Sequence, residues 1–343
     1  MTQILKTLST IKRINAYRKL SESAKNQVLM DISQVCNAQC YFCPTGMANR
    51  NHTPIACEGN RFMDVELFRT IIKDLKAKKF LTPGSELVLY IWYEPLLHPE
   101  FAKIVEIANE EQCLLDLSTN ANVLPSLPNA FDASSITSMF ISMCGFSQAS
   151  YDRIHRFDFE RIKNNIRTWV RTLRRHGCIG RITIRFHVYQ FNVHEIPAAY
   201  EFAKSLNIIL DPYFAFPIDF RKWGNFLQEA LPSDYLTRIA QDLFMSLNAR
   251  HKAPTTQCDW FRNGLALNAK GEVLPCCNIQ DPIGNVFDLT QDKLLEWHQK
   301  VDFCKECMRL GLPGTEMERC TFFQPHYSWK LRRYWEIIKT ALS

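Results

Sequence analysis

Residues 31–46 read DISQVCNAQCYFCPTG and place three cysteines, Cys36, Cys40 and Cys43, within eight residues. The stretch includes the end of an apolar run, VLMDIS at positions 28–33, that is typical of a short β-strand. Three thiols this close together indicate metal binding or catalysis. A structural zinc ion requires four closed ligands, and this spacing supplies three. A [4Fe–4S] cluster held by three thiolates keeps one iron open for another ligand.

The composition is typical of a cytoplasmic protein with reduced thiols. Thirteen cysteines, an odd number, in a 343-residue chain without a secretion signal do not suggest a disulfide framework. The formal charge of +6 is modest and its Lys and Arg residues are dispersed, which argues against a nucleic-acid partner. No apolar run has the length of a membrane span.

Strand-like and helix-like runs alternate through the middle of the chain. Six short apolar runs begin near residues 28, 86, 114, 138, 181 and 208. Helical periodicity is found at 64–79, 100–111, 159–176 and 195–206, with Asp64 as an N-cap. This alternation predicts βαβ units in an α/β fold with parallel strands. Six repeats fall short of a closed eight-fold barrel, so we expect a partial (β/α)6 barrel with its chemistry at the carboxyl ends of the strands.

The motif CNAQCYFC at residues 36–43 resembles the signature of the radical S-adenosylmethionine (radical SAM) superfamily. The resemblance implies a [4Fe–4S] cluster on Cys36, Cys40 and Cys43, whose open iron binds S-adenosylmethionine. It also implies that the cofactor is cleaved to a 5′-deoxyadenosyl radical, which takes hydrogen from a substrate. An electron donor such as flavodoxin or ferredoxin is then required.

The segment LVLYIWYEPLL at residues 87–97 resembles the family's Gly-rich motif that ends in Glu-Pro. The match implies that Glu94 accepts a hydrogen bond from the methionine ammonium of the cofactor. Trp92 and Tyr93 stand where small residues are usual in the family, and glycine there allows close approach of the backbone to a ligand. The alternative for Glu94 is an ordinary surface acid.

Two further segments resemble cofactor-binding parts of the family. DLSTNANVL, at 116–124, is similar to a Ser-Thr-Asn-Gly segment and implies that Ser118 and Asn120 contact the ribose or carboxylate of the cofactor. ISMCGFSQASYDRIHR, at 141–156, is similar to the fourth-strand segment, with Cys144 in place of the usual acid. It implies that Ser142 and Arg156 contact the cofactor. The alternative for the first segment is a simple turn that ends a strand.

The C-terminal cysteines form a second pattern, which resembles the Twitch extension, a shortened form of the SPASM extension. Twelve residues separate Cys258 from Gly271, and four more precede Cys276. Cys304 and Cys307 follow as a Cys-x2-Cys pair. The resemblance implies one auxiliary [4Fe–4S] cluster with the ligands Cys258, Cys276, Cys304 and Cys307. Cys277 and Cys320 are alternates, and the competing interpretation is a zinc ribbon.

These patterns predict five segments along the chain. They are an N-terminal helical segment at 1–27, a partial barrel at 28–220, a helical linker at 221–257, an iron–sulfur extension at 258–325 and a C-terminal helix at 326–343.

The fifth strand-like run, RITIRFHVY at 181–189, alternates strictly between apolar and polar residues. A polar face is expected where a partial barrel encloses a polar substrate or cofactor. Arg185, His187 and Tyr189 are therefore the substrate-side candidates, with His187 or Tyr189 as a base. The alternative is an edge strand with one solvated face.

Taken with the resemblance, these features predict an oxidoreductase that acts on a small polar metabolite such as a sugar, an aminocyclitol or a conjugate. The auxiliary cluster favours a two-electron oxidation over epimerisation. Modification of a ribosomally made peptide is an alternative, but relatives of that kind carry an N-terminal recognition domain, for which the roughly 27 residues before the first strand are too few. A remote alternative is a zinc-stabilised module that binds RNA or protein.

Overall fold

The structure, a computed structural model, describes residues 27–40, 42–53, 59–82, 85–215, 241–243, 254–255, 258, 260 and 264–312. Cys320, the predicted C-terminal helix, nearly all of the predicted N-terminal segment and most of the predicted linker lie outside these residues. No helix within the described ranges combines the length and the apolar character that a membrane crossing requires.

The predicted parallel strands are present and lie side by side in chain order. They are β1 (Gln27–Met30), β2 (Glu86–Val88), β3 (Leu114–Thr119), β4 (Ile136–Met143), β5 (Arg181–Val188) and β6 (Ile209–Phe214). In the described part of the chain, β6 pairs with β5 alone and the sheet does not close on itself by hydrogen bonds. The prediction of a partial α/β barrel is therefore confirmed.

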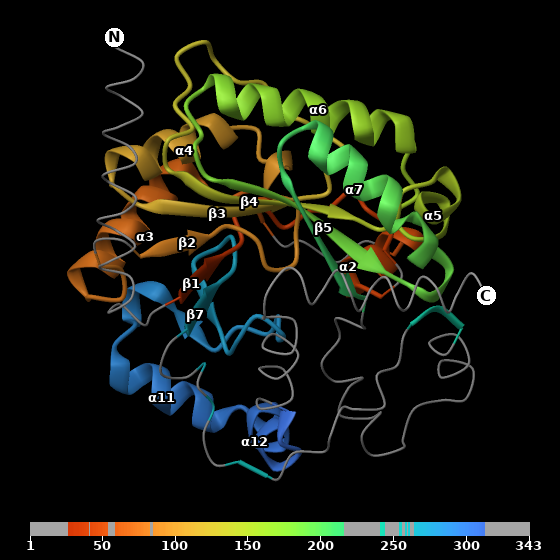
Figure 1. Cartoon of the computed structure of the whole chain (residues 1–343). Helices are drawn as coiled ribbons and strands as arrows, with labels where there is room; N and C mark the ends of the chain where they lie inside the picture. The colour runs from red at the N-terminus through yellow and green to blue at the C-terminus, as the bar shows by residue number, and fades with distance from the viewer. Residues whose placement is uncertain are drawn as a thin grey trace.

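The C-terminal part of the chain continues the same sheet (Figure 1). Strand β7 (Gly264–Leu267) pairs in parallel with β1, and β8 (Glu272–Leu274) and β9 (Gly284–Asn285) follow as antiparallel neighbours. Helices α11 (Gln291–Lys300) and α12 (Asp302–Arg309) come next. Hydrogen bonds thus join the predicted extension directly to the first strand of the barrel.

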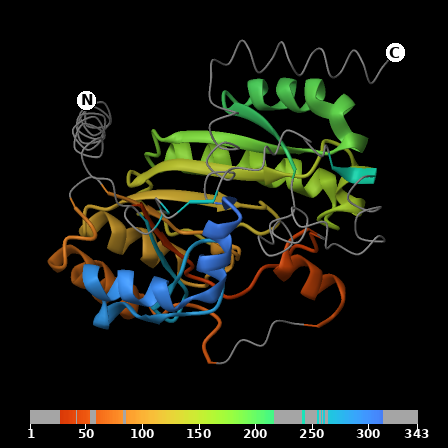
Figure 2. The same cartoon turned by 90° about the horizontal axis from the view of Figure 1, so that it is seen from below.

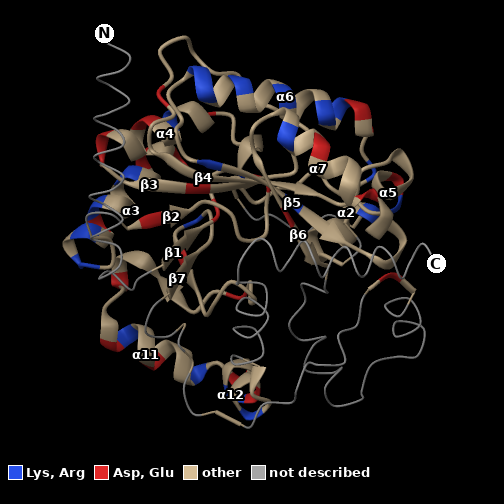
Figure 3. Cartoon of the chain, in the orientation of Figure 1, with Lys and Arg blue, Asp and Glu red and all other residues tan. Residues whose placement is uncertain are grey.

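The four predicted helices are confirmed, each end within two residues of its expected position. They are α3 (Val65–Ala77), α4 (Phe101–Glu110), α6 (Phe159–Arg175) and α7 (Ile196–Ser205). Asp64 caps α3, because its carboxylate accepts hydrogen bonds from two backbone N–H groups of the first turn. The shorter helices are α2 (Pro44–Arg50) and α5 (Gln148–Arg153), with single turns η1 (Pro95–Leu97), η2 (Gln190–Glu195) and η3 (Val286–Asp288). Lys and Arg residues lie along the length of α6 (Figure 3).

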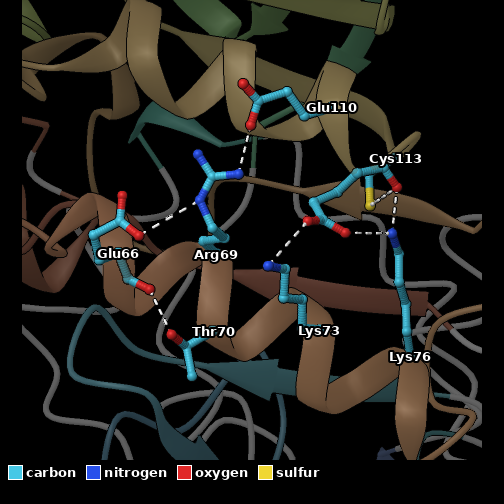
Figure 4. A network of polar contacts seen from close by, with 8 residues as sticks. Glu66, Arg69, Thr70, Lys73, Lys76, Glu110 and Cys113 are labelled. Carbon is cyan, nitrogen blue, oxygen red and sulfur yellow. Dashed lines mark hydrogen bonds and ion pairs between the residues drawn. The ribbon is translucent and has the colours of Figure 1, made fainter.

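Salt bridges connect α3 to the end of α4 at the molecular surface (Figure 4). Arg69 pairs with Glu110 at 2.5 Å, and the Lys76 ammonium lies 2.9 Å from the Glu111 carboxylate. Because these groups are exposed or partly exposed, solvent screens both pairs and they add little to stability. The apolar residues beneath the two helices therefore supply most of the stability of this layer.

The sheet presents two different faces. One packs against α3, α4, α6 and α7 and forms the main core, with Val28, Leu115 and Ile184 among its strand residues (Figures 1 and 2). Alternate residues point to the other face, which we call the inner face. It carries a small apolar cluster on β1, β2, β7 and β8, formed by Leu29, Val88, Ala266 and Leu274. On β3, β4 and β5 the inner face is largely polar; the alternation in the sequence predicted this for β5.

Candidate functional site

The three N-terminal cysteines lie in the segment that joins β1 to α2. The backbone N–H of Cys43 donates to the carbonyl of Cys40 at 3.2 Å, and Pro44 then begins α2 at a position where proline is favoured. Burial is the main cause that raises the pKa of the Cys40 thiol, and the nearby Cys43 and Cys36 raise it further. The structure thus brings the three predicted cluster ligands together.

This donor set fits an iron–sulfur cluster. Thiolates are soft ligands that suit iron–sulfur clusters, and iron bound to them would relieve their mutual repulsion. No three Cys, His, Asp or Glu side chains of the described residues converge as ligands of a single metal ion. In a four-iron cluster, by contrast, each cysteine binds a different iron.

Two residues of α2 fix the backbone of the cysteine loop. The Asn49 amide donates to the carbonyls of Cys36 at 2.7 Å and Ala38 at 2.8 Å. The Arg50 guanidinium donates to the Gln39 carbonyl at 2.9 Å and reaches carbonyls at the end of α5. The sequence analysis missed both residues. Both are polar residues on the helix that follows the cysteine motif, and this position could have identified them.

Gly46 lies against the backbone of the second cysteine. A Cβ atom at this position would come within 2.3 Å of the carbonyl oxygen and 2.5 Å of the nitrogen of Cys40. Those distances are far below van der Waals contact, and both atoms belong to backbone that cannot move aside. A residue larger than glycine would therefore displace Cys40.

Glu94 is buried, and its hydrogen bonds connect the segment after β2 with the end of β3 and with the cysteine loop. Its carboxylate accepts hydrogen bonds from the backbone N–H groups of Leu96 at 3.1 Å and Asn120 at 2.8 Å. Its own backbone N–H donates to the carbonyl of Val35 at 3.0 Å. Burial raises the pKa of Glu94 to about 7, and these hydrogen bonds oppose the shift. A carboxylate has about four acceptor sites, so capacity for an ammonium remains.

Asp31, which the sequence analysis did not select, holds the segment before Glu94. Its buried carboxylate accepts from the backbone N–H of Ile91 at 2.8 Å and of Trp92 at 3.2 Å. Burial raises the pKa of Asp31 to about 7 despite these bonds. This anchor explains how the chain accommodates a buried tryptophan where small residues are usual in the motif.

Asn120 lies beside the first cysteine. Its side-chain amide donates to the Asn37 side-chain oxygen at 2.8 Å and lies 3.9 Å from the Cys36 sulfur. Its side-chain oxygen accepts from the backbone N–H of Asn122 at 2.9 Å. The end of β3 and the cysteine loop are therefore in direct contact.

The other predicted cofactor residues lie at two places. Ser118 on β3 and Ser142 on β4 face each other across the inner face, with 3.5 Å between their hydroxyl oxygens. Arg156 lies outside the sheet, where its guanidinium donates to the Gln39 side chain in the cysteine loop at 3.2 Å. Its φ of 59° is in the left-handed region, which is uncommon for a residue with a side chain.

Two of the three substrate-side candidates lie on the inner face as predicted. The Arg185 guanidinium stacks on the Phe140 ring, 3.7 Å from its centroid. The His187 ring meets the Tyr213 ring edge-on at 4.8 Å. Burial, with smaller contributions from His155 and Arg185, lowers the pKa of His187 to about 3. The imidazole is therefore neutral near pH 7 and a weak base.

Tyr189 was expected on the polar face, and the structure places it just beyond the end of β5, buried near Cys40 and Tyr213. The residue follows the last residue of β5 and packs into the main core. Its ring stacks against Phe42, at 5.9 Å, and Phe191, at 5.1 Å. Burial raises the pKa of Tyr189 well above its ordinary value. The alternation of the strand ends at Val188 because the chain turns there into η2.

Three of the C-terminal cysteines come close together. Burial raises the pKa of Cys304 to about 12, and the neighbouring Cys276 and Cys258 contribute to the shift. Cys307 lies one turn after Cys304 on α12. Cys277 instead packs against the apolar cluster of the inner face. The alternate Cys320 lies outside the described residues.

His298 on α11 supports the turn that carries Cys276. It is buried, and its ring nitrogens lie 2.7 Å from the Leu294 carbonyl and 2.6 Å from the Pro275 carbonyl. Through these contacts it links α11 to the residue before Cys276. The sequence analysis missed it, because a single histidine on a helix carries no distinguishing signal.

Comparisons with known proteins agree with this geometry. The family model described as the radical SAM superfamily matches residues 30–203. Native anSMEcpe with bound AdoMet is similar at a TM-score of 0.53 and 14% identity, over 91% of this chain and 99% of that chain. Streptococcus suis SuiB bound to the precursor peptide SuiA is similar at 0.52 and 12%, over 82% and 66%. Such distant likenesses show the fold alone. No curated protein matches the chain.

Proposed function

The chain belongs to the radical SAM superfamily, and we propose that it is an oxidoreductase that acts on a small polar metabolite such as a sugar, an aminocyclitol or a conjugate. Membership implies a [4Fe–4S] cluster and S-adenosylmethionine, and we assign the cluster to Cys36, Cys40 and Cys43. When bound, cluster and cofactor together supply the 5′-deoxyadenosyl radical that takes hydrogen from the substrate. Every other role below belongs to side chains of this protein.

Cofactor binding is assigned to the residues around the cysteine loop. Glu94 accepts from the ammonium of S-adenosylmethionine, because it is buried beside the first cysteine and retains acceptor capacity. Asn120, Ser118 and Ser142 contact the ribose or the carboxylate from the ends of β3 and β4. Arg156 contributes positive charge next to the loop.

The polar inner face supports a small polar substrate. Along β3, β4 and β5 this face presents Asp116, Ser118, Ser142, Arg185 and His187, whereas the opposite face of the same strands is apolar core. Polar side chains directed into a partial barrel suit hydroxyl and amine groups of a ligand. This is the observation that carries the proposal.

An auxiliary [4Fe–4S] cluster on Cys258, Cys276, Cys304 and Cys307 completes the proposal. Support comes from the proximity of Cys276 and Cys258 to Cys304, whose pKa both of them raise. A fully ligated cluster suits electron transfer better than substrate binding, and so favours a two-electron oxidation. A flavodoxin or ferredoxin in the cytoplasm is the proposed electron donor.

The deciding experiment uses reconstituted, reduced protein and extracts of small metabolites in which candidate substrates carry deuterium at carbon. We expect deuterium in 5′-deoxyadenosine and a product that is two electrons more oxidised, formed in equal amounts. Turnover of peptides instead of metabolites, or a product of unchanged oxidation level, would contradict the proposal while leaving superfamily membership intact.

A further inference from the structure

Asp116 lies on the inner face where its apolar part meets its polar part. In the sheet it is in register with Val88 of β2, which belongs to the apolar cluster, and with Ser138 of β4. Tyr90 follows β2, packs against the same cluster, and directs its hydroxyl to Asp116. The carboxylate thus lies beside an apolar surface on one side and hydroxyl groups on the other.

Within the described part of the chain, one oxygen of this carboxylate has no hydrogen-bond partner. The Oδ1 atom of Asp116 is buried and accepts no hydrogen bond from any residue that the structure describes. The Oδ2 atom is 3.4 Å from the Tyr90 hydroxyl, which is a long hydrogen bond. Ser138 is near enough to favour the charged carboxylate but does not satisfy Oδ1. Such an oxygen is unfavourable for folding and calls for a functional reason.

The charges around Asp116 are complementary to a further cation. Burial is the main cause that raises the pKa of Asp116 to about 7; Glu86 raises it as well, and Arg185 lowers it. Asp116 is not the only neighbour of Arg185, which is also in register with Asp211 on β6 and stacks on Phe140. Arg181, in register with Ser138, lies over the same Phe140 ring, 6.0 Å from its centroid. Two guanidinium groups therefore share this part of the inner face with three carboxylates, those of Glu86, Asp116 and Asp211.

We propose that Asp116 binds a protonated amine of the substrate, with Tyr90 as the residue that positions the carboxylate. The inference rests on the proposed function and narrows its substrate class to polar metabolites with an amine, such as amino sugars and aminocyclitols. An ammonium group donates three hydrogen bonds, so it satisfies Oδ1 and balances the buried charge. A site with an unpaired buried acceptor also discriminates strongly against an analogue that lacks the donor.

Binding is tested on the full-length reconstituted protein with S-adenosylmethionine present and no reductant. The probes are two matched pairs, glucosamine with glucose and trans-2-aminocyclohexanol with trans-1,2-cyclohexanediol, titrated by NMR saturation transfer. We expect the wild type to prefer each amine to its hydroxyl partner. Asp116→Asn should weaken amine binding by roughly ten- to a hundredfold and leave hydroxyl binding unchanged, because a charge-assisted hydrogen bond is lost. Tyr90→Phe should cause a smaller loss of the same kind.

Glu201→Gln is the matched control, since Glu201 is an exposed acid on α7 whose carboxylate lies 3.8 Å from the Lys204 ammonium. It should bind all four probes as the wild type does. Thermal unfolding supplies a second readout: Asp116→Asn should unfold at the same or a higher temperature, because it removes an unsatisfied charge. A lower unfolding temperature would indicate a structural role and overturn the proposal. So would the absence of an amine preference in the wild type, or unchanged amine binding by Asp116→Asn.

The binding assay separates this inference from the proposed function. Amine binding that depends on Asp116, in a protein that fails to oxidise any metabolite, would leave the inference standing and remove the oxidative role. Oxidation of a metabolite that has no amine, at a rate that Asp116→Asn does not change, would support the oxidative role and overturn the inference.

Discussion

The carboxylate of Glu94 and the backbone N–H of Asn120 are joined by a 2.8 Å hydrogen bond. The bond links the segment after β2 to the end of β3, and Asn120 in turn contacts the first cysteine. Glu94, which is proposed to bind the cofactor, therefore also stabilises the loop that carries the cysteines. Substitution separates the two roles in part, because the cofactor contact requires charge, whereas the structural role requires two acceptor oxygens.

Glu94→Gln should weaken the binding of S-adenosylmethionine by roughly ten- to a hundredfold, since the charge is lost. It should retain most of the iron, because the single amide oxygen keeps one of the two backbone hydrogen bonds. Glu94→Ala should in addition reduce the iron retained by the protein. Isothermal titration with iron analysis measures both effects, and Glu160→Gln, an exposed acid on α6, is the control. Wild-type affinity in Glu94→Gln would contradict the proposed ammonium contact.

Cys36→Ala, Cys40→Ala and Cys43→Ala should each abolish production of 5′-deoxyadenosine, because two thiolates hold a four-iron cluster poorly. Cys144→Ala is the matched control, since this buried cysteine lies near Cys40 but is not a proposed ligand. Liquid chromatography of the nucleoside products provides the measurement. Normal production by any one of the first three variants would make the ligand assignment wrong.

Gly46→Ala should release the cluster although no ligand is changed, because the added methyl group meets the backbone of Cys40 at 2.3 Å. The visible absorbance of the reconstituted protein and its iron content report the loss. Gly59→Ala is the control: its Cβ meets nothing within 4 Å, so its positive φ of 84° should cost only about 1–2 kcal/mol of stability and no iron. Full iron content in Gly46→Ala would show that the loop can relax.

Cys304→Ala and Cys307→Ala should lower the iron content from about eight to about four per chain, the contents of two clusters and one. Cleavage of S-adenosylmethionine should continue, whereas the yield of oxidised product should fall far below that of 5′-deoxyadenosine. Cys178→Ala, a buried cysteine of the main core, should change neither quantity. Wild-type iron content in both α12 variants would exclude the auxiliary site from these residues.

The stability of the wild type relative to Asp116→Asn should depend on pH. Burial raises the pKa of Asp116 to about 7, whereas an unfolded aspartate has a pKa of about 3.9. Between these values the folded state binds the extra proton, so the free energy of unfolding of the wild type decreases as pH rises from about 4 to 7. The decrease relative to the variant is at most about 1.4 kcal/mol per pH unit. Denaturant unfolding at pH 5 and pH 7 measures it, and equal differences at both would refute the shifted pKa.

The strands and helices of the barrel were predictable because their periodicity reflects burial on one side. The alternation of β5 predicted which side chains enter the core, whereas Tyr189 lies beyond the end of the strand, where the alternation no longer applies. Family motifs located the cysteines and Glu94. Asp31, Asn49 and Arg50 were not predictable, because each acts through backbone groups that come near only in the folded chain. The pairing of β7 with β1 was likewise hidden, since no local pattern specifies a partner so distant in sequence.

The parallel pairing of β1 with β7 joins residues about 240 positions apart, Gln27 with Gly264 among them. During synthesis on a ribosome, one edge of β1 therefore stays open until most of the chain has emerged. Contacts between such distant residues form slowly, and an open strand edge is prone to aggregation. The strand that leads into the cysteine loop is thus the last of the barrel strands to gain its second neighbour, and a chain that ends before β7 would expose that edge permanently.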